Sequence, residues 1–529
     1  MYSLSRVALR RSLLPCYEVS KPLNSLLRFQ KIEAVSDSSR DHESATPGAR
    51  PFEDIPGRPK NLRSIAESYW KTKGFTKGYK LWDELFQKYG PIFKEFAVIG
   101  THSVHLIDPV DQEKALRAEG KYPSRLIVDF WLEHRQRRNY FPGIVLLEGE
   151  EWYRVRHSVA PKIMRPKIME ENIDNFTAVT NDAIARLAKL KEECGPDGYI
   201  PDLEEELSKW ATESVGTLAF DSRLGLYEDP PKEEAMRFIT EVHNFFSISH
   251  KLFFSVSRRI AKNFNIDTPL LKKFFKTADA LIEIGEGFVD KKMRELKEMS
   301  DKEIDPSGNT QVVPLLTYLL TKKELTPQEV VGVVLDVVGA GVDTTANTTL
   351  WMLYNLGRNP RVQDKLYQEV DSVVGKDADV TSQSLAKLSY LKACLKETMR
   401  LHPVVSANSR ILDEDIELRG YHVPARTFIV LENYCTARSE KYFEDPLEYK
   451  PERWLRENRE EAHAFASIPF GFGPRMCLGR RLAELEIYLF ICKLLQRFQI
   501  EYNQGPLEMY QKLIMVPDKP VNIKLIDRL

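Results

Sequence analysis

The stretch from Thr326 to Leu353 constrains the fold more than any other part of the chain. It opens Thr326-Pro-Gln-Glu329, with a capping residue, a proline at the first helical position and a glutamate two residues later. The residues from 330 to 353 are then almost wholly apolar, which is typical of a helix buried on all sides. The pattern therefore predicts a long helix through the middle of a mainly α-helical molecule.

This predicted helix also carries residues that a buried helix does not need. Gly339 and Gly341 each cost roughly 1 kcal/mol of helix propensity, which close approach of a flat ligand would offset. Asp343 and Thr344 follow, and a buried carboxylate is costly unless it is paired or used. Thr344 has two interpretations: its hydroxyl bonds back to a helix carbonyl, or it takes part in chemistry. Asp336, two turns earlier, has no assigned role.

A second informative stretch runs from Phe470 to Glu484 and joins a glycine-rich loop to an apolar pattern of helical period. Because that pattern begins at Leu478, Cys477 is predicted at a helix N-terminus, where the helix dipole favours a thiolate. Neither a C-x-x-C nor an H-x-x-x-H pattern lies nearby, which disfavours zinc. The alternative is an inert buried cysteine.

The spacing of Phe470, Gly473, Arg475, Cys477 and Gly479 resembles the heme-binding signature of the cytochrome P450 family, F-x-x-G-x-R-x-C-x-G. The resemblance implies the family's mainly α fold, a large helical domain with small β-sheets. It also implies heme b buried between the long central helix and the cysteine loop, with the Cys477 thiolate as axial ligand.

Other motifs resemble the family in the expected order. The run from Ala340 to Thr345 is similar to the oxygen-activation motif, which implies that Ala340 borders the heme. The same motif implies that Asp343 supplies protons while Thr344 positions dioxygen and water. Trp152 and Arg156, one helical turn apart, resemble a W-x-x-x-R motif that binds a heme propionate.

Arg410 and Arg475 resemble further propionate partners. For the motif of Trp152 and Arg156, the alternative is a solvated helix with ordinary surface arginines. Glu397, Arg400 and Arg453 resemble a buried network that holds the cysteine loop in place. Taken alone, the E-x-x-R pair is a common surface ion pair of little energetic value.

The organisation of the chain is predicted from composition along its 529 residues. Residues 1–35 are rich in arginine and poor in acids, which predicts a mitochondrial transit peptide rather than a disordered basic tail. Residues 36–58 read as a linker and proline-rich hinge, and residues 59–529 as the P450 domain. The net charge of −1 gives no reason to expect nucleic acid, and six unpatterned cysteines favour a reducing compartment.

Details of the resemblance indicate the mitochondrial branch of the family. Lys392 and Lys396 are similar to residues that dock an acidic [2Fe-2S] ferredoxin, which its reductase supplies with electrons. Arg480 and Arg481 extend the cysteine motif in the manner of that branch. The alternative is that these are solvated charges.

The aromatic segment 235–275, with interleaved basic residues, is the expected lid of the substrate pocket. It also suits peripheral contact with the matrix side of the inner mitochondrial membrane, although the alternative is that its aromatics are simply core.

The expected function is insertion of one oxygen atom of O2 into a hydrophobic substrate, with sterols, steroids and secosteroids as the implied class. Three alternatives stay open: a broad-range detoxifying mitochondrial monooxygenase, a heme-thiolate isomerase or dehydratase that needs no redox partner, and a non-catalytic heme carrier or gas sensor. The presence of Asp343 and Thr344 disfavours the last two.

Overall fold

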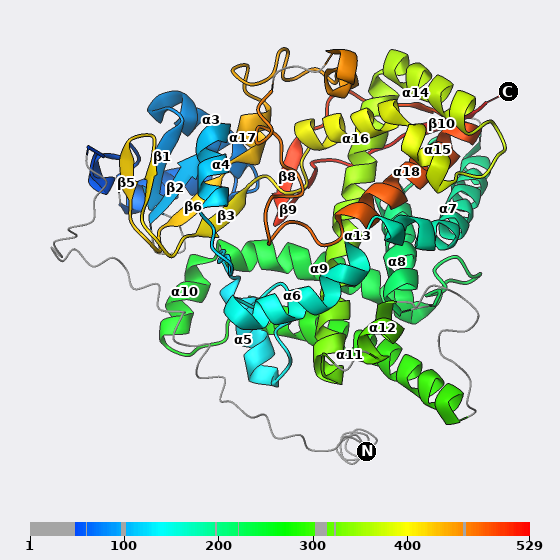
Figure 1. Ribbon diagram of the computed structural model, residues 1–529, viewed down its shortest axis with the longest axis horizontal. Coiled ribbons are helices and arrows are strands. Elements are labelled where there is room, and N and C mark those ends of the chain that lie inside the picture. Colours follow the sequence, from blue (N-terminus) through cyan, green and yellow to red (C-terminus); the bar gives the residue numbers. More distant parts are fainter. Residues whose placement is uncertain are drawn as a thin grey trace.

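The computed structural model describes residues 48–59, 61–96, 102–195, 198–220, 222–301, 315–321, 324–458 and 462–528. Helices dominate these residues, and the four-stranded sheet lies to one side of the helical bulk (Figure 1). The predicted transit peptide lies outside the described residues. Within the predicted linker, Ile55 is buried and the Arg50 guanidinium lies 3.8 Å from the centre of the Tyr421 ring. The domain boundaries themselves stay a prediction.

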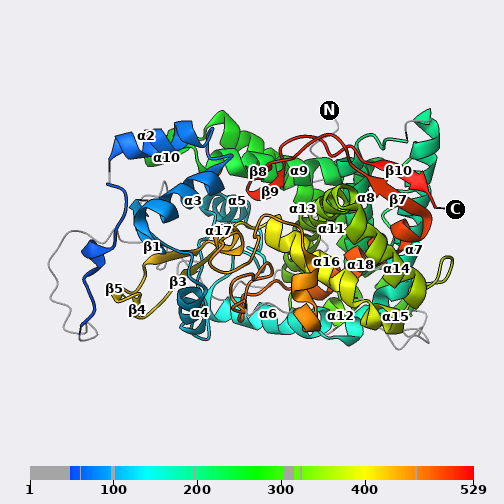
Figure 2. The same cartoon turned by 90° about the horizontal axis from the view of Figure 1, so that it is seen from above.

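The predicted central helix is α13 (Pro327–Arg358), and it crosses the interior of the molecule (Figures 1 and 2). Its start is a capping box, in which the Thr326 hydroxyl accepts from Glu329 N–H while the Glu329 carboxylate accepts from Thr326 N–H. Helix α8 (Leu203–Phe220) packs along it. A Cβ atom at Gly341 would lie 3.0 Å from Val215 on α8, so glycine permits this close approach.

The other helices include several that pack directly against α13. In chain order the other helices are α2 (Leu62–Lys71), α3 (Gly78–Tyr89), α4 (Pro109–Arg117), α5 (Asp129–Arg138), α6 (Gly149–Ile163), α7 (Lys167–Glu193), α9 (Glu233–Phe253), α10 (Val256–Asn263), α11 (Pro269–Asp301), α12 (Leu315–Thr321), α14 (Pro360–Val373), α15 (Ser382–Lys387), α16 (Ser389–Leu401), α17 (Asn433–Ala437) and α18 (Arg480–Arg497), with 3-10 turns η2 (Phe52–Asp54), η4 (Pro451–Trp454) and η5 (Arg456–Asn458).

The principal sheet joins distant parts of the chain, in the strand order β1-β2-β6-β3. β1 (Ile92–Phe96) and β2 (His102–Leu106) form an antiparallel pair. β2 also pairs in parallel with β6 (Phe428–Leu431), which pairs with β3 (Asn408–Ile411). The remaining antiparallel pairs are β4 (Ile416–Leu418) with β5 (Tyr421–Val423), β7 (Phe498–Glu501) with β10 (Lys524–Asp527), and β8 (Met509–Lys512) with β9 (Ile514–Pro517).

The aromatic segment 235–275 falls on α9, α10 and the start of α11. Phe274 is fully buried and packs edge-on against Phe130 of α5, and Trp131 of α5 donates to Ser249 of α9 at 2.8 Å. Phe238, Phe274 and Phe275 are buried core residues, whereas Phe245, Phe246, Phe253 and Phe254 are half-buried. Phe264, by contrast, is 70% exposed at the end of α10.

Candidate active site

The loop before α18 has a backbone that glycine makes possible. Gly471 and Gly473 have φ values of +69° and +76°, in the left-handed region that favours glycine. A Cβ atom at Gly473 would also lie 1.8 Å from a carboxylate oxygen of Glu119. Cys477 N–H donates to the Phe470 carbonyl at 2.8 Å, which closes the loop. α18 begins at Arg480, with Gly479 as its N-cap, rather than at Leu478 as the apolar pattern indicates.

Cys477 differs from the other described cysteines in its surroundings. Burial raises the pKa of its thiol, while the Gly479 N–H and the charges of Arg156 and Arg480 act in the opposite direction. Its side chain is nevertheless exposed although protein surrounds it on most sides. Cys477 therefore faces an internal space. Cys394, Cys435 and Cys492 are buried, and burial raises the pKa of each; Cys194 is exposed at the end of α7.

Three predicted arginines converge on this loop from different elements. Arg156 on α6 donates to the Met476 carbonyl at 2.7 Å, and Arg410 on β3 donates to the Phe472 carbonyl at 3.1 Å. Arg475 donates to the carbonyls of Pro123 and Leu147, at 2.9 and 2.8 Å. Its guanidinium also lies 3.9 Å from the ring centre of Trp152, one turn before Arg156 on α6.

A fourth arginine, Arg125, completes this cluster and was not predicted from the sequence. It is half-buried, and it donates to the Val145 carbonyl at 3.0 Å. Burial and the neighbouring Arg410 lower its pKa. Burial and the charges of Arg125, Arg410 and Arg156 lower the pKa of Arg475 to about 9, although Glu148 opposes this effect. Arg125 follows no motif, so no sequence signal could have identified it.

We use "arginine cluster" for Arg125, Arg156, Arg410 and Arg475. Glu119 is ion-paired with Arg410, and Glu148 accepts from the backbone N–H of Arg125 at 3.4 Å. These two carboxylates leave an excess of positive charge next to the Cys477 loop. Two additional carboxylates would balance it.

The central helix supplies the third side of the site. Ala340 is exposed and Thr344 is half-buried, although both lie in the middle of a helix most of whose residues are buried, so this face of α13 also borders an internal space. The Thr344 hydroxyl donates to the Ala340 carbonyl at 2.7 Å, which is the back-bonding alternative, and its oxygen remains able to accept. Asp343, the residue just before Thr344, is buried.

Asp336 acquires a structural role that the sequence left unassigned. Its carboxylate accepts from the Val145 N–H at 3.0 Å and lies 3.8 Å from Arg135 of α5. A Cβ atom at Gly143 would lie 2.2 Å from the same carboxylate. Asp336 therefore ties α13 to the segment 143–148, whose carbonyls accept from Arg125 and Arg475.

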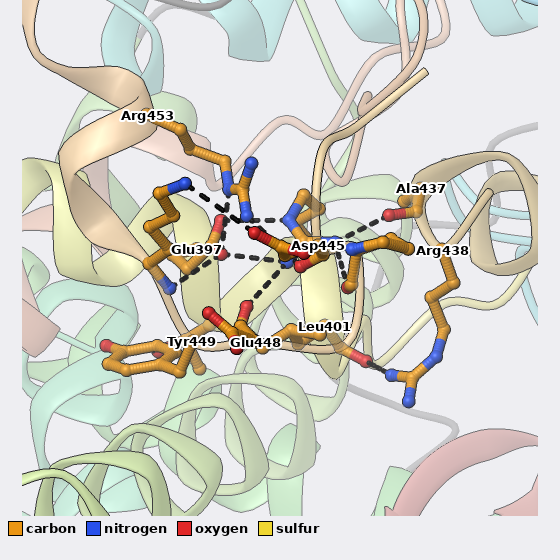
Figure 3. Close-up of polar contacts among 12 residues, drawn as sticks. Glu397, Leu401, Ala437, Arg438, Asp445, Glu448, Tyr449 and Arg453 are labelled. Atoms are coloured by element: carbon orange, nitrogen blue, oxygen red, sulfur yellow. Dashed lines mark hydrogen bonds and ion pairs between the residues drawn. The ribbon is translucent and has the colours of Figure 1, made fainter. Parts of the chain in front are cut away.

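The predicted acid–arginine network is buried and its contacts are complete (Figure 3). Arg400 donates twice to Glu397, each at 2.8 Å, and Arg453 donates to Glu397 at 3.0 Å. Lys450 N–H and the Trp454 indole also donate to Glu397. Arg400 further donates to the carbonyls of Ala437, Pro446 and Glu448. These bonds clamp the segment 437–454 to α16, so any effect on the Cys477 loop passes through the intervening chain.

The predicted docking residues occupy one side of α16 and α18. Lys396 is exposed, and Lys392 donates to the Ala386 carbonyl at 2.8 Å. Arg480 is exposed and paired with Glu484, whose charge also acts on Lys392. Arg481 is half-buried and donates to the Met164 carbonyl at 2.8 Å, so its guanidinium is already engaged. Their role in docking stays a prediction.

Comparison with known proteins settles which family has this architecture. A sequence model of the cytochrome P450 family matches residues 56–525. The chain belongs to the cytochrome P450 family.

It is 34% identical to the sterol 26-hydroxylase, mitochondrial, of Rattus norvegicus, over 94% of each chain. It is 34% identical to cytochrome P450 10 of Lymnaea stagnalis, over 90% of this chain and 86% of that protein. It is also 33% identical to the 1,25-dihydroxyvitamin D(3) 24-hydroxylase, mitochondrial, of Rattus norvegicus, over 87% of this chain and 86% of that protein.

Membership confirms the predicted mainly α P450 fold, and the chain is a heme-thiolate monooxygenase. The residues of the site fit a heme in two respects. The excess charge of the arginine cluster matches two propionates, and a thiol and the exposed Ala340 border internal space from two sides. Within the described residues, no helix combines the length and the apolar character that crossing a bilayer requires.

Replacement of Glu397 by Gln should destabilise the P450. It leaves Arg400 and Arg453 buried without their anionic partner, a loss of about 3–5 kcal/mol. We expect a large fall in the thermal unfolding midpoint and reduced retention of heme, both measurable by absorbance. Glu440→Gln, at an exposed position, is the matched control. Equal stability of the two variants would contradict the proposed energetics.

The stability of the P450 should depend on the ionisation of Asp336. Burial raises the pKa of Asp336 to about 6, above the ordinary value of 3.8, although Arg135 opposes the shift. A carboxyl with a raised folded-state pKa stabilises the fold below its unfolded pKa, and this contribution is lost as the pH rises to about 6. The gap corresponds to about 3 kcal/mol.

Asp336→Asn removes this titration, so the stability of the wild type should fall relative to the variant between pH 4 and 6 and run parallel above it. Thermal unfolding at each pH measures the difference, with the exposed Asp371→Asn as control. A constant difference across the range would exclude the titration.

Proposed function

We propose that this P450 hydroxylates a sterol, steroid or secosteroid in mitochondria, with Cys477 as the axial ligand of its heme. The arrangement of the Cys477 thiol within reach of the arginine cluster carries the assignment of the ligand. The substrate class rests on relatives named for sterol and vitamin D hydroxylation and for cholesterol side-chain cleavage. When bound, a heme with a thiolate ligand supplies activation of dioxygen and insertion of one oxygen atom into a C–H bond.

The residues of the chain would orient the cofactor and control protons. Arg125, Arg156, Arg410 and Arg475 would hold the two propionates, with Trp152 stacked beneath the Arg475 guanidinium. Ala340 would border the heme, and Phe470 and Gly479 would fix the backbone on either side of Cys477. Asp343 would supply protons to the face of α13 at Thr344, whose hydroxyl oxygen can accept while its proton bonds to Ala340.

Electrons would come from a mitochondrial [2Fe-2S] ferredoxin and its reductase. Lys392 and Lys396 of α16 and Arg480 of α18 give this side of the molecule a positive character next to the Cys477 loop. Complementary charge speeds the encounter of two proteins and orients them. The relatives named as mitochondrial support the same organelle.

A peripheral membrane contact fits the surface formed by α2 and α10. Trp70 of α2 is 78% exposed. Ile260 of α10 is 57% exposed, and Phe264, the C-cap of that helix, is 70% exposed. Phe75 and Phe254 stack at 4.4 Å and join the turns beside these helices. Exposed apolar side chains with lysines nearby suit an anionic membrane face, here the matrix side of the inner membrane.

The proposal predicts a specific absorption spectrum for the reduced, carbon monoxide-bound protein. The Soret band should lie at the thiolate-shifted position, and Cys477→Ser should abolish it because the thiolate is lost. Cys194→Ser, at an exposed position on the far end of α7, should keep it. Retention of the band in Cys477→Ser would exclude Cys477 as the ligand.

A screen of sterols, steroids and secosteroids with ferredoxin, its reductase and O2 then tests the reaction. Turnover that needs neither O2 nor reductase would favour an isomerase or dehydratase, and turnover of many unrelated compounds would favour a detoxifying enzyme.

Reversal of charge on α16 should weaken the ferredoxin interaction. Lys392→Glu with Lys396→Glu should raise the KM for ferredoxin about tenfold and weaken its dependence on ionic strength, with kcat at saturating ferredoxin nearly unchanged. Lys291→Glu with Lys297→Glu on α11 is the control at two other exposed lysines. An equal change in both double variants would show that only net charge matters.

A further inference from the structure

His243 contacts the buried acid of the central helix. It stands on α9, and its Nε2 atom lies 3.1 Å from Asp343 Oδ1, within hydrogen-bonding reach although imperfectly aligned. The same nitrogen lies 3.2 Å from the hydroxyl oxygen of Ser208 on α8. No sequence motif singles out His243, because its partners are far away along the chain.

The neighbours of His243 determine which of its ring nitrogens carries hydrogen. The Ser208 hydroxyl donates to the Glu204 carbonyl at 2.8 Å, so its oxygen is left to accept from the imidazole. Asp343 also accepts when it is ionised. Nε2 therefore faces two acceptors and bears the hydrogen, which leaves Nδ1 free to bind a further proton.

The imidazole joins a buried carboxylate to solvent. The His243 side chain is 39% exposed, whereas that of Asp343 is only 8% exposed. Glu204 of α8 and Lys512 of β8, the other charged groups that act on it, are both exposed. Burial disfavours the charged imidazole, but the contact with Asp343 and the charge of Glu204 outweigh burial and the charge of Lys512, and they raise its pKa above 6.5.

We propose that His243 is a positioning residue that passes solvent protons to Asp343. A proton from solvent binds Nδ1, the Nε2–H bond breaks, and that proton forms an O–H bond on Asp343. The imidazole is then neutral with its hydrogen on Nδ1, and exchange with water restores the starting tautomer. This inference rests on the proposed function, in which Asp343 supplies protons to the active site.

The placement of His243 on α9 also couples this transfer to the lid of the pocket. α9 packs against α8 and α13, and its aromatic residues contact α5 and α11. A displacement of α9 away from α13 would separate Nε2 from Asp343 and interrupt the path. Protons would then reach the Asp343 carboxylate only when α9 is packed against α13.

The first test measures protonation directly and does not require turnover. In the reduced, carbon monoxide-bound holoenzyme, which is diamagnetic, labelled imidazole resonances are followed by NMR against pH, and His243→Gln identifies the His243 signal. We expect a midpoint above 6.5 that falls by at least half a pH unit in Asp343→Asn. An unchanged midpoint in Asp343→Asn would overturn the proposal.

The second test measures product formed per pair of electrons consumed. His243→Gln should lower this ratio about fivefold to tenfold and flatten its decline at pH values above the His243 midpoint, because glutamine does not titrate. Substrate binding, followed by the substrate-induced absorbance change, should stay within twofold. His422→Gln removes a histidine paired with Asp415 at 2.9 Å on the distant strand β5, and it should change nothing.

Two further variants separate the possible explanations. His243→Lys keeps a cation beside Asp343 but does not bind and release protons at neutral pH, so the relay predicts the same loss as in His243→Gln. Full rescue by lysine would show a purely structural ion pair and overturn the inference. A normal ratio of product to electrons in Asp343→Asn would refute the proposed function of Asp343. A lowered ratio in Asp343→Asn together with a normal ratio in His243→Gln would refute only the role of His243.

Discussion

Positive charge concentrated beside the Cys477 loop is the constraint on which the rest of the site depends. Arg125, Arg156, Arg410 and Arg475 donate to backbone carbonyls from separate elements, and this brings α6, β3 and the segment 143–148 onto one loop. Two nearby carboxylates do not balance the cluster, and burial together with the charges of the neighbouring arginines lowers the pKa of Arg475. Such an arrangement is favourable only with further anions, which a heme provides through its propionates.

Local signals in the sequence predicted the parts whose cause is local. The capping box of α13 follows from the spacing of its first residues, and the mainly α P450 fold follows from a resemblance that the comparisons confirm. Arg125, the role of Asp336 and His243 could not be predicted, because each acts through a partner that only the tertiary fold brings near. The roles of the predicted site residues and the domain boundaries stay predictions.

The central helix α13 connects several parts of the molecule, because two of its acidic residues contact different elements. Asp336 holds the segment that accepts from the arginine cluster, and Asp343 contacts His243 of α9. Ala340, between them, faces internal space. A helix that is buried almost all round is therefore in contact with the segment beside the arginine cluster, with internal space at Ala340 and with α9 at the same time.

The arginine cluster has a consequence for the life of the protein in a cell. Because the cluster stores electrostatic repulsion that an anionic cofactor relieves, heme acts as a stabilising ligand of the folded chain. The population of folded enzyme then rises with the concentration of available heme, and chains made in excess of the cofactor are the ones exposed to proteolysis. This linkage by itself makes the abundance of the enzyme depend on the supply of heme.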